Sequence, residues 1–497
     1  MDPKILIVGA GPVGLTLAIE LARYDVPVRI IDKAPARTDK SKALVLWSRT
    51  LELLARSGGA SAFVDAGFKA EAVNIIAGDK LIGRVMMTDI QTPFPFGLML
   101  PQSETERLLE ERLNGFGVTV ERRVELVGFT DKSDTVEARL AAPNGDETRS
   151  FPWLVGCDGA HSAVRHGLAL PFTGETLESD WILADVHMTG YPCPDNEASV
   201  YWHRDGVFVI FPISPGRYRV LADLPSSGAP QTPTPTLEQV QTIIDRRGPS
   251  GLVAFDPIWL AGFRINGRKV ADYRHGRVFL AGDAAHVHSP AGGQGMNTGM
   301  QDAFNLAWKL AMVIRGEART SLLDSYSPER SGVGDEVLKS AGRLTAIGTL
   351  RNPLVQELRN LVAHVAFGFA PVRHAFATAM TEVAIGYPAS PLNGAALAGG
   401  PKPGERVVPM AGETPAGSGN KPRFVLAAAA SAAAADLTAR FSSLIDPALR
   451  PALQASAYWL TRPDGYVACA SSDPAVLATY LEAIEPAPSA REGPLPA

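Results

Sequence analysis

Apolar residues near the N-terminus follow first a strand pattern and then a helix pattern. Residues 4–8 form a short apolar run that is typical of a buried parallel strand, and residues 15–22 repeat apolar side chains at helical spacing. A second apolar run, residues 27–31, ends at Asp32. This order of strand, helix and strand predicts a βαβ unit with a parallel sheet.

Further along the chain the pattern becomes one of short alternating strands. Between residues 118 and 140, and again between 176 and 263, apolar and polar side chains alternate, with turn pairs such as Asp205-Gly206 between the runs. Residues 277–281 return to a buried-strand pattern, followed by helical spacing to about residue 384. We therefore predict an α/β fold, with a Rossmann-like nucleotide-binding domain and an inserted, mostly antiparallel β-sheet domain.

Length and composition limit the class of protein. A chain of 497 residues is too long for one hydrophobic core, so two or three domains are expected. The net charge of −5 gives no footprint of nucleic-acid or anionic-membrane binding. The longest apolar run, residues 424–435, is too short to span a bilayer. The three cysteines lie far apart without a CxxC pair, so we expect no disulfide framework and a cytoplasmic protein.

The first βαβ unit carries a glycine pattern at its strand–helix junction. Gly9, Gly11 and Gly14 allow a tight turn, close approach of a pyrophosphate to the backbone, and packing of the helix on the strand. Asp32 follows at the end of the second strand, where a carboxylate accepts hydrogen bonds from ribose hydroxyls. The spacing predicts a dinucleotide site.

A second pattern, far away in the sequence, suits the other end of a long cofactor. An apolar strand ends at Gly282-Asp283, and a carboxylate there can accept hydrogen bonds from a polyol such as ribitol. Residues 290–297 then open a helix with several glycines. The free N–H groups of such a helix start stabilise a delocalised anion such as reduced flavin. The two halves together predict FAD as the cofactor.

Two further groups of polar residues are less specific. Asp158-Gly159, followed by Arg165, is by itself the pattern of a tight turn before a capped helix. Because the other two motifs are also present, we predict that this segment contacts the cofactor. His286 and His288 are spaced like half of a metal site, but no carboxylate or thiolate cluster accompanies them. We therefore predict structural histidines and no metal.

Together the three motifs closely resemble those of the group A flavoprotein monooxygenases, the single-component aromatic hydroxylases typified by p-hydroxybenzoate hydroxylase and phenol hydroxylase. The resemblance covers about residues 3–335. Residues 462–466, Arg-Pro-Asp-Gly-Tyr, are similar to part of the thioredoxin-like C-terminal domain of the phenol and polyketide hydroxylase branch, which also lacks a CxxC pair. The implied parts are an FAD-binding domain (1–75, 99–170 and 266–335), a substrate-binding sheet domain (76–98 and 171–265), a helical extension (336–395), a thioredoxin-like domain (396–485) and a disordered tail (486–497).

The resemblance implies a set of residues at the cofactor. Lys42 stands where the family usually has an arginine that reaches the pyrophosphate, and lysine supplies charge without a bidentate fork, so Arg49 is a candidate to share the role. Gln102 matches a family residue that contacts FAD, and Pro290 is expected to position flavin and substrate. The predicted cofactor-binding residues are Gly9, Gly11, Pro12, Val13, Gly14, Asp32, Lys33, Lys42, Arg49, Gln102, Leu126, Asp158, Arg165, Gly282, Asp283, Pro290, Gly293, Gln294, Gly295, Met296 and Asn297.

The resemblance also implies the reaction. NADPH or NADH reduces FAD, O2 adds to form a flavin C4a-hydroperoxide, and one oxygen atom passes to an aromatic, phenolic or polyketide-like small molecule. The choice between NADPH and NADH stays open, as does that between a monomer and a homodimer. Baeyer–Villiger insertion or epoxidation also stays open. Halogenation is disfavoured because a Trp-x-Trp-x-Ile-Pro segment is absent, and a non-catalytic FAD sensor is disfavoured by the intact flavin-ring segment.

Substrate recognition is expected on the inserted sheet. The candidates with flat or apolar side chains are Trp202, Phe208, Ile210 and Phe211. Their surfaces suit an aromatic ring, although an ordinary sheet core accounts for each of them equally well. His203 is the titratable candidate for polarising a phenol, and it is the predicted catalytic residue together with Pro290.

Overall fold

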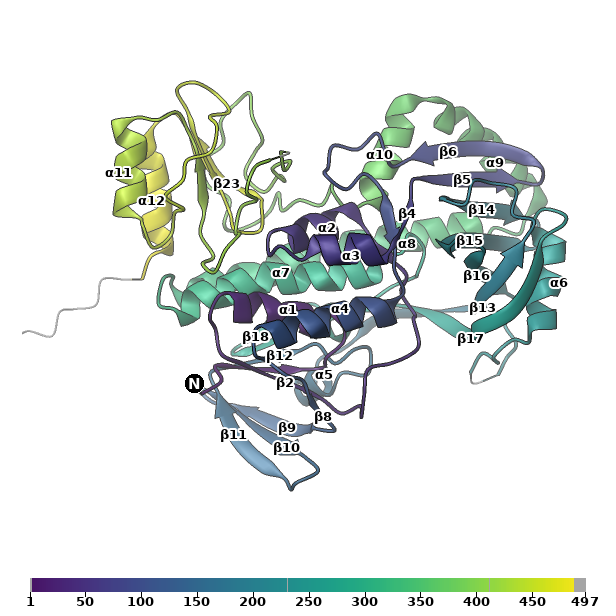
Figure 1. The fold of residues 1–497 in the computed structure, drawn as a ribbon, viewed down its shortest axis with the longest axis horizontal. Coiled ribbons are helices and arrows are strands. Elements are labelled where there is room, and N and C mark those ends of the chain that lie inside the picture. Colours follow the sequence, from purple (N-terminus) through teal and green to yellow (C-terminus); the bar gives the residue numbers. More distant parts are fainter. Residues whose placement is uncertain (1, 230, 411, 487–497) are drawn as a thin grey trace, which may run out of the picture.

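The computed structural model, which describes residues 2–229, 231–410 and 412–486, contains two large sheets and a smaller C-terminal unit (Figure 1). The first large sheet has five parallel strands and one antiparallel edge strand, as the apolar runs predict. In their order across the sheet, the strands are β18 (Arg274–His275), β19 (Val278–Leu280), β12 (Trp153–Gly156), β1 (Ile5–Val8), β2 (Val28–Asp32) and β8 (Glu121–Arg122).

Helices α1 (Pro12–Arg23) and α7 (Gly295–Ile314) pack against each other over this sheet. Helix α7 is buried along most of its length, because α1, α2 (Ser48–Ala55) and α8 (Tyr326–Gly348) surround it. Shorter elements complete this half of the molecule: β3 (Val45–Leu46), β4 (Phe68–Ala70), β7 (Gly97–Met99), β9 (Glu125–Asp131), β10 (Val136–Ala141), β11 (Glu147–Phe151), α2 (Ser48–Ala55), α3 (Ala60–Ala66), α4 (Gln102–Gly115), α5 (Ala163–Gly167), η1 (Gly282–Ala284) and η2 (Thr320–Ser325).

The second large sheet has eight strands and is antiparallel except where β14 runs parallel to β5. In their order across the sheet, the strands are β20 (His286–Val287), β17 (Val253–Lys269), β13 (Thr173–Thr189), β16 (Arg217–Leu224), β15 (Gly206–Ser214), β14 (Glu197–His203), β5 (Ala72–Ala77) and β6 (Lys80–Met86). Strands β5 and β17 run across the domain limits predicted at residues 75 and 265.

Helices cover the second sheet. Helix α6 (Leu237–Arg247) packs on one face of the sheet through Val240 and Ile244. Figure 1 shows α9 (Pro353–Gly368) and α10 (Ala370–Met380) beside β5 and β6, with α8 (Tyr326–Gly348) leading to them from the first sheet. The helical segment predicted to continue to about residue 384 is therefore confirmed, and it covers the inserted sheet.

The C-terminal unit contains a three-stranded antiparallel sheet and two helices. Its elements are β21 (Val425–Ala427), α11 (Ala432–Arg440), β22 (Tyr458–Thr461), β23 (Val467–Ser471) and α12 (Pro474–Ile484). The tail predicted for residues 486–497 lies, apart from residue 486, outside the described residues.

The turn at residues 462–466 joins this unit to the FAD-motif half of the chain. Arg462 donates to Glu329 at 2.6 Å and to Asp464 at 2.6 Å, and Lys309 of α7 donates to Glu329 at 2.7 Å. All four side chains are nearly inaccessible to solvent. Removing one partner of such a buried cluster costs about 3–5 kcal/mol, so the cluster ties the C-terminal unit to α7 and α8.

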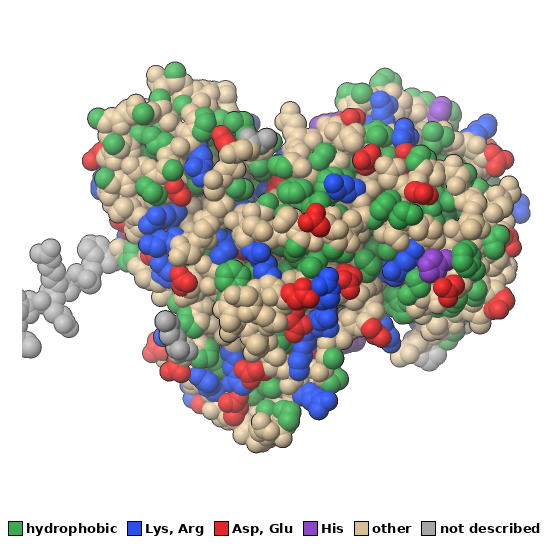
Figure 2. Space-filling model, in the orientation of Figure 1, with side chains coloured by type: hydrophobic (Ala, Val, Ile, Leu, Met, Phe, Trp, Pro, Cys, Tyr) green, Lys and Arg blue, Asp and Glu red, His purple; other side chains and the backbone are tan. Residues whose placement is uncertain are grey.

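The outer surface offers no preference for a polyanion or a bilayer on the face that Figure 2 shows. Lys and Arg side chains are interspersed with Asp and Glu there. Within the described ranges, no helix combines the length and the apolar character needed to cross a membrane.

Candidate active site

Three loops meet at the carboxyl edge of the six-stranded sheet. They follow β1, β12 and β19, which lie side by side in the sheet. Gly9 has a left-handed φ of +102°, and a Cβ there would lie 2.4 Å from the carbonyl oxygen of Cys157. On the other side, a Cβ on Gly282 would lie 2.7 Å from Cγ2 of Val13. The first glycine motif therefore touches the Asp158 loop and the Asp283 loop.

The loop between β1 and α1 is closed on one side and open on the other. A Cβ on Gly14 would lie 2.0 Å from the carbonyl oxygen of Gly9, so the helix packs on the loop at a distance that requires glycine. Around Gly11, no heavy atom of the described residues lies within 4 Å of a Cβ position. The first turn of α1 thus faces free space, where its N–H groups and the helix dipole suit a pyrophosphate.

The carboxylate of Asp32 is held by two backbone N–H groups. Ala10 donates to it at 2.7 Å and Ala34 at 2.8 Å. The side chain of Asp32 is 19% exposed, so lone pairs remain for ribose hydroxyls. Lys33 beside it is exposed, whereas Leu126 is buried in β9 and can offer a ligand only its backbone.

Lys42 lies on an exposed loop that is held from two directions. The side chain of Gln102 accepts a hydrogen bond from the N–H of Ala43 at 3.2 Å. Arg219 of β16 donates to the carbonyl oxygen of Lys42 at 3.0 Å and pairs with Asp185 at 2.7 Å. Lys42 and Gln102 are thus brought together. The buried pair of Arg219 and Asp185, which no sequence motif indicated, ties this loop to the second sheet.

Asp283 stands in η1, directly after β19. Its side chain is exposed. Desolvation by the surrounding protein raises the pKa of Asp283, while the charges of His286 and Lys42 act in the opposite sense. Asp302 of α7 fixes the loop from behind, since it accepts the N–H of Gly282 at 2.9 Å and lies 2.8 Å from Nε2 of His286. Asp283 therefore combines a fixed backbone with an available carboxylate.

A tight turn precedes α7 and packs against β3. Gly293, with a φ of +63°, donates its N–H to the carbonyl oxygen of Pro290 at 2.9 Å. A Cβ on Gly293 would lie 2.4 Å from Cγ1 of Val45, so the turn can approach the strand only with glycine there. The indole of Trp47 donates to the carbonyl oxygen of Gly292 at 2.9 Å and fixes the turn from the same side.

Asn297 fastens the first turn of α7 to β3. Its side chain donates to the carbonyl oxygen of Val45 at 2.9 Å and accepts the N–H of Trp47 at 2.8 Å. Gln294 donates in a similar way to the carbonyl oxygen of Ala379 at 3.0 Å. Both amide side chains are thereby committed. Among the described residues, the backbone N–H groups of residues 295–297 have no acceptor, and they are the donors this helix start offers to a ligand.

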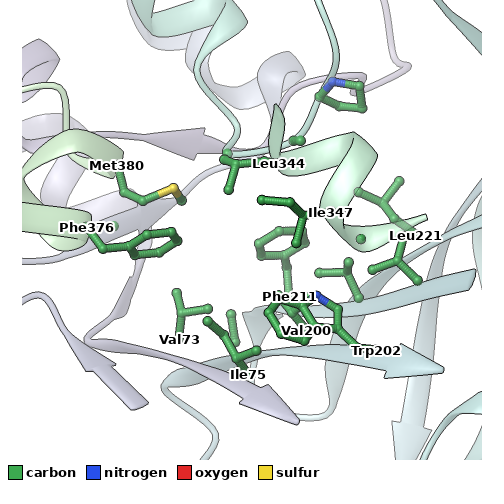
Figure 3. A pocket seen from close by; sticks show the side chains of 18 of the residues that line it. Val73, Ile75, Val200, Trp202, Phe211, Leu221, Leu344, Ile347, Phe376 and Met380 are labelled. Atoms are coloured by element: carbon green, nitrogen blue, oxygen red, sulfur yellow. The ribbon is translucent and has the colours of Figure 1, made fainter. Parts of the chain in front are cut away.

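An apolar cavity of about 480 Å³ adjoins the same turn. Figure 3 shows side chains from both sheet and helices directed into it. Residues 290–292 form part of its wall, and strands β5, β14 and β15 and helices α8, α9 and α10 form much of the rest. The larger side chains of the lining include Trp47, Ile75, Trp181, Trp202, Phe211, Leu344, Ile347, Phe367, Phe376 and Met380.

Comparison with known proteins identifies the family. The model of a family described as "FAD binding domain" matches residues 2–341. The chain belongs to this family, as a flavoprotein monooxygenase of the group A aromatic hydroxylases. It is 40% identical over 402 residues to a 6-methylpretetramide 4-monooxygenase of Streptomyces rimosus, an alignment that covers 78% of this chain and 71% of the relative.

Two further comparisons agree. A pentachlorophenol 4-monooxygenase of Sphingobium chlorophenolicum is 33% identical over 350 residues, covering 68% of this chain and 63% of the relative. The solved structure of an anhydrotetracycline hydroxylase from Streptomyces rimosus superposes with a TM-score of 0.79 at 28% identity, covering 98% of this chain and all of that one. The likeness to the solved structure therefore extends through the C-terminal unit of this monooxygenase.

The loops after β1, β12 and β19 and the starts of α1 and α7 are together called the cofactor cleft. The donors and acceptors of this cleft fit FAD. Free space at Gly11 and the start of α1 suits the pyrophosphate, and the carboxylates of Asp32 and Asp283 suit the hydroxyls of ribose and ribitol. Oδ1 of Asp158 is a buried oxygen with no partner among the described residues, although Oδ2 accepts the N–H of Ala163 at 2.6 Å. No set of three metal-binding side chains gathers anywhere in the described ranges.

Two side chains that are predicted to contact the cofactor, those of Arg49 and Arg165, are engaged in other contacts. The Arg49 guanidinium is buried away from the cleft, donates to Glu52 and to the carbonyl oxygen of Asp464, and lies on the ring of Tyr466. Arg49 therefore secures the C-terminal unit and cannot share the role of Lys42.

Arg165 also turns inward. It is 3% exposed and donates to the carbonyl oxygens of Ala284 at 3.0 Å and Ala160 at 2.7 Å, with its guanidinium over the ring of Phe172. Its contacts join the Asp158 loop to the Asp283 loop, so it shapes the cleft without presenting its charge there.

The predicted substrate residues lie on two different faces of the sheet, because successive side chains of a strand point in opposite directions. Trp202 of β14 and Phe211 of β15 line the cavity. Phe208 and Ile210 point to the other face of β15, where they are completely buried in the core under α6, and they do not line the cavity. The ring of His203, the predicted catalytic residue, faces Asp205 in the hairpin turn, and His203 does not line the cavity.

The sequence does not indicate most of the residues that line the cavity. Trp47 and the side chains of α8, α9 and α10 carry no motif, because apolar residues at helical spacing predict a buried helix face without saying what it faces.

Proposed function

We propose that this flavoprotein monooxygenase hydroxylates a flat phenolic or polycyclic aromatic compound bound in the apolar cavity. The observation that carries the proposal is the shared turn: residues 290–292 line the cavity, and the same turn opens the helix whose first N–H groups have no acceptor among the described residues. A volume of about 480 Å³ lies within the range of about 300–1,000 Å³ typical of small-molecule sites. The wall is apolar and aromatic, which favours a flat ring system.

The chain's own residues have defined tasks in this proposal. Bound FAD supplies the activation of O2 and the transfer of one oxygen atom, with electrons from NADPH or NADH. The N–H groups of residues 295–297 stabilise negative charge on the ring, and Asp283 orients the ribitol chain. Trp47 and Asn297 hold the turn in place. The apolar lining excludes water, which protects reactive oxygen species from side reactions.

Relatives support the class of substrate. The related proteins named above act, by their names, on 6-methylpretetramide or anhydrotetracycline and on pentachlorophenol. These compounds are respectively polycyclic and phenolic, and both are compatible with an apolar cavity lined by Trp202 and Phe211.

The test is cofactor consumption coupled to product analysis. Purified protein loaded with FAD is given NADPH or NADH with phenols, hydroxybenzoates and polycyclic quinones in turn, and product mass is measured beside nucleotide oxidation. A product heavier by one oxygen atom supports the proposal, and its position, found by NMR, separates hydroxylation from Baeyer–Villiger insertion or epoxidation. Oxidation of NADPH and NADH that is indifferent to every aromatic, without any oxygenated product, would contradict it.

We also propose that residues 396–485 form a thioredoxin-like domain. The order β21, α11, β22, β23 and α12 supports this. Cys469 is buried in β23, which is compatible with a structural rather than a redox role.

A further inference from the structure

One charged side chain stands in the apolar cavity. Among the described residues that line it, Arg359 of α9 is the only charged one, and the lining contains no Asp, Glu, His or Tyr. The guanidinium lies over the ring of Trp202, with its Cζ 4.4 Å from the ring centroid. Burial lowers the pKa of Arg359, and no other cause contributes to the shift.

No described residue neutralises this charge. Within the described parts of the chain, no carboxylate lies within ion-pair distance of Arg359. Its hydrogen bonds go to neutral oxygens: Nε and Nη2 donate to the side-chain oxygen of Asn360 at 3.0 and 2.9 Å, and Nη1 donates to the carbonyl oxygen of Ile347 at 2.9 Å. These three bonds leave one N–H on each terminal nitrogen for a ligand.

The fixed position of the guanidinium suits recognition. Asn360 and Ile347 hold it from two sides, and the indole of Trp202 supports its face, so little rotamer entropy is lost when a ligand binds. A partly buried cation without a counter-ion is costly to maintain. An anionic oxygen on the ligand offsets that cost, whereas a neutral ligand of the same shape does not.

We propose that Arg359 is an anion-recognition site within the substrate cavity, and that the preferred substrate is an aromatic compound bearing an ionised hydroxyl or enol oxygen. This inference rests on the proposed function and specifies its substrate class. Among the described residues that line the cavity, no side chain could take a proton from a neutral phenol, so a compound already ionised in solution fits its chemistry. In this arrangement the indole of Trp202 contacts both the Arg359 guanidinium on its ring face and the bound substrate.

The experiment compares two ligands of nearly equal shape. 2-Hydroxy-1,4-naphthoquinone is an anion at neutral pH, and 2-methoxy-1,4-naphthoquinone is its neutral methyl ether. Binding of each to the FAD-loaded protein is measured by calorimetry at pH 7.5. We expect the wild type to bind the anion at least about tenfold more tightly, which corresponds to about 1.4 kcal/mol.

Three variants locate the preference. Arg359→Met should bring the two dissociation constants within about twofold of each other, mainly by weakening the binding of the anionic ligand. Arg359→Lys should keep part of the preference, because it retains the charge and loses the planar fork. Arg373→Met is the matched control: Arg373 lies in the neighbouring helix α10, donates to the carbonyl oxygen of Gly368 at 3.0 Å, and does not line the cavity.

The outcomes are distinct. Equal binding of the two ligands by the wild type, failure of the wild type to bind the anion, or an unchanged preference in Arg359→Met would overturn the inference. A wild type without the preference that still forms oxygenated product from neutral aromatics would leave the proposed function intact. A circular dichroism spectrum and melting temperature like those of the wild type verify that Arg359→Met is folded.

Discussion

The cofactor cleft and the substrate cavity adjoin each other but are built in opposite ways. The cleft is made of backbone and carboxylates in three short loops, with glycines at the points of closest approach. The cavity is made, apart from Arg359, of apolar residues from elements between Trp47 and Met380 in the sequence. Phosphate and polyol groups dictate which residues can hold them, whereas an apolar ring accepts many.

This difference sets how each region should respond to substitution. The cleft depends on distances between backbone atoms, so one added methyl group is enough to disturb it. Whether a side chain lines the cavity depends on the face of the strand on which it lies. Substitutions at neighbouring residues of one strand should therefore have different kinds of effect. The boundary between the two regions, where α10 meets α7, should respond to protonation of a buried acid.

The largest effect is expected for Gly14→Ala. The added Cβ would lie 2.0 Å from the carbonyl oxygen of Gly9, so the loop must move and the pyrophosphate site is lost. We expect FAD affinity to fall by at least about 100-fold, measured by flavin absorbance after dialysis, since more than about 3 kcal/mol of contacts depends on this loop. Gly115→Ala at the end of α4 is the control, because its Cβ would meet open space. Normal flavin content in Gly14→Ala would contradict the account of the cleft.

A matched pair of substitutions tests the faces of β15. Phe208→Ala should lower the free energy of unfolding by about 3–5 kcal/mol, because Phe208 is completely buried under α6, and should leave KM for an aromatic substrate nearly unchanged. Phe211→Ala should raise KM with a smaller loss of stability, since Phe211 lines the cavity. Denaturant unfolding and steady-state kinetics measure the two effects. The reverse pattern would show that the cavity lies on the other face of the strand.

An intermediate effect is expected at Asp283. Asp283→Ala removes the acceptor for the ribitol chain and should weaken FAD binding by about 10–100-fold, the value of a hydrogen bond to a charged group. Asp283→Asn retains a neutral acceptor and should cost less. Flavin occupancy is compared by absorbance among the wild type and both variants. Equal occupancy in all three would refute the assignment of Asp283 to the polyol.

The smallest effect concerns Glu382, which lies between α10 and α7. Burial raises the pKa of Glu382 to about 8, against the effect of hydrogen bonds from Thr298 at 3.0 Å and Gln301 at 2.5 Å. The folded protein therefore holds a proton that the unfolded chain releases at about pH 4–5. Stability should decline as the pH rises from there to about 8 and then level off.

Glu382→Gln removes this titration. The melting temperature of the variant, relative to that of the wild type, should rise by about 2 °C between pH 6 and pH 9. The amide can be accommodated because Oε1 of Gln301 is buried without a partner among the described residues and can accept from it after rotation. A constant difference in melting temperature across this range would mean that Glu382 is ionised in the folded protein at neutral pH.

The sequence predicted the cleft better than the cavity, for a physical reason. Strand β1, helix α1 and the acid at the end of β2 are contiguous, and each needs particular residues at particular spacing. The start of α7 is readable for the same reason, because its turn requires glycine at position 293. These patterns also gave the family, which the comparisons confirm.

The missed features lack such local signals. Residues 207–213 are apolar on both faces of β15, because α6 covers one face and the cavity lies at the other, so alternation alone could not assign Phe208 and Phe211. Arg49 has the charge expected at a pyrophosphate, but its guanidinium binds the turn at residues 462–466 through the carbonyl oxygen of Asp464 and the ring of Tyr466. The pair of Arg219 and Asp185 depends on strands β13 and β16 being neighbours, which the sequence does not state.

The most direct test of the account is a crystal structure of the protein with FAD. We expect the pyrophosphate at the N-terminus of α1, the ribitol within hydrogen-bonding distance of Asp283, and the tricyclic ring against the turn at residues 290–293, at the mouth of the apolar cavity. A flavin ring bound away from that turn, or separated from the cavity by protein, would contradict the account.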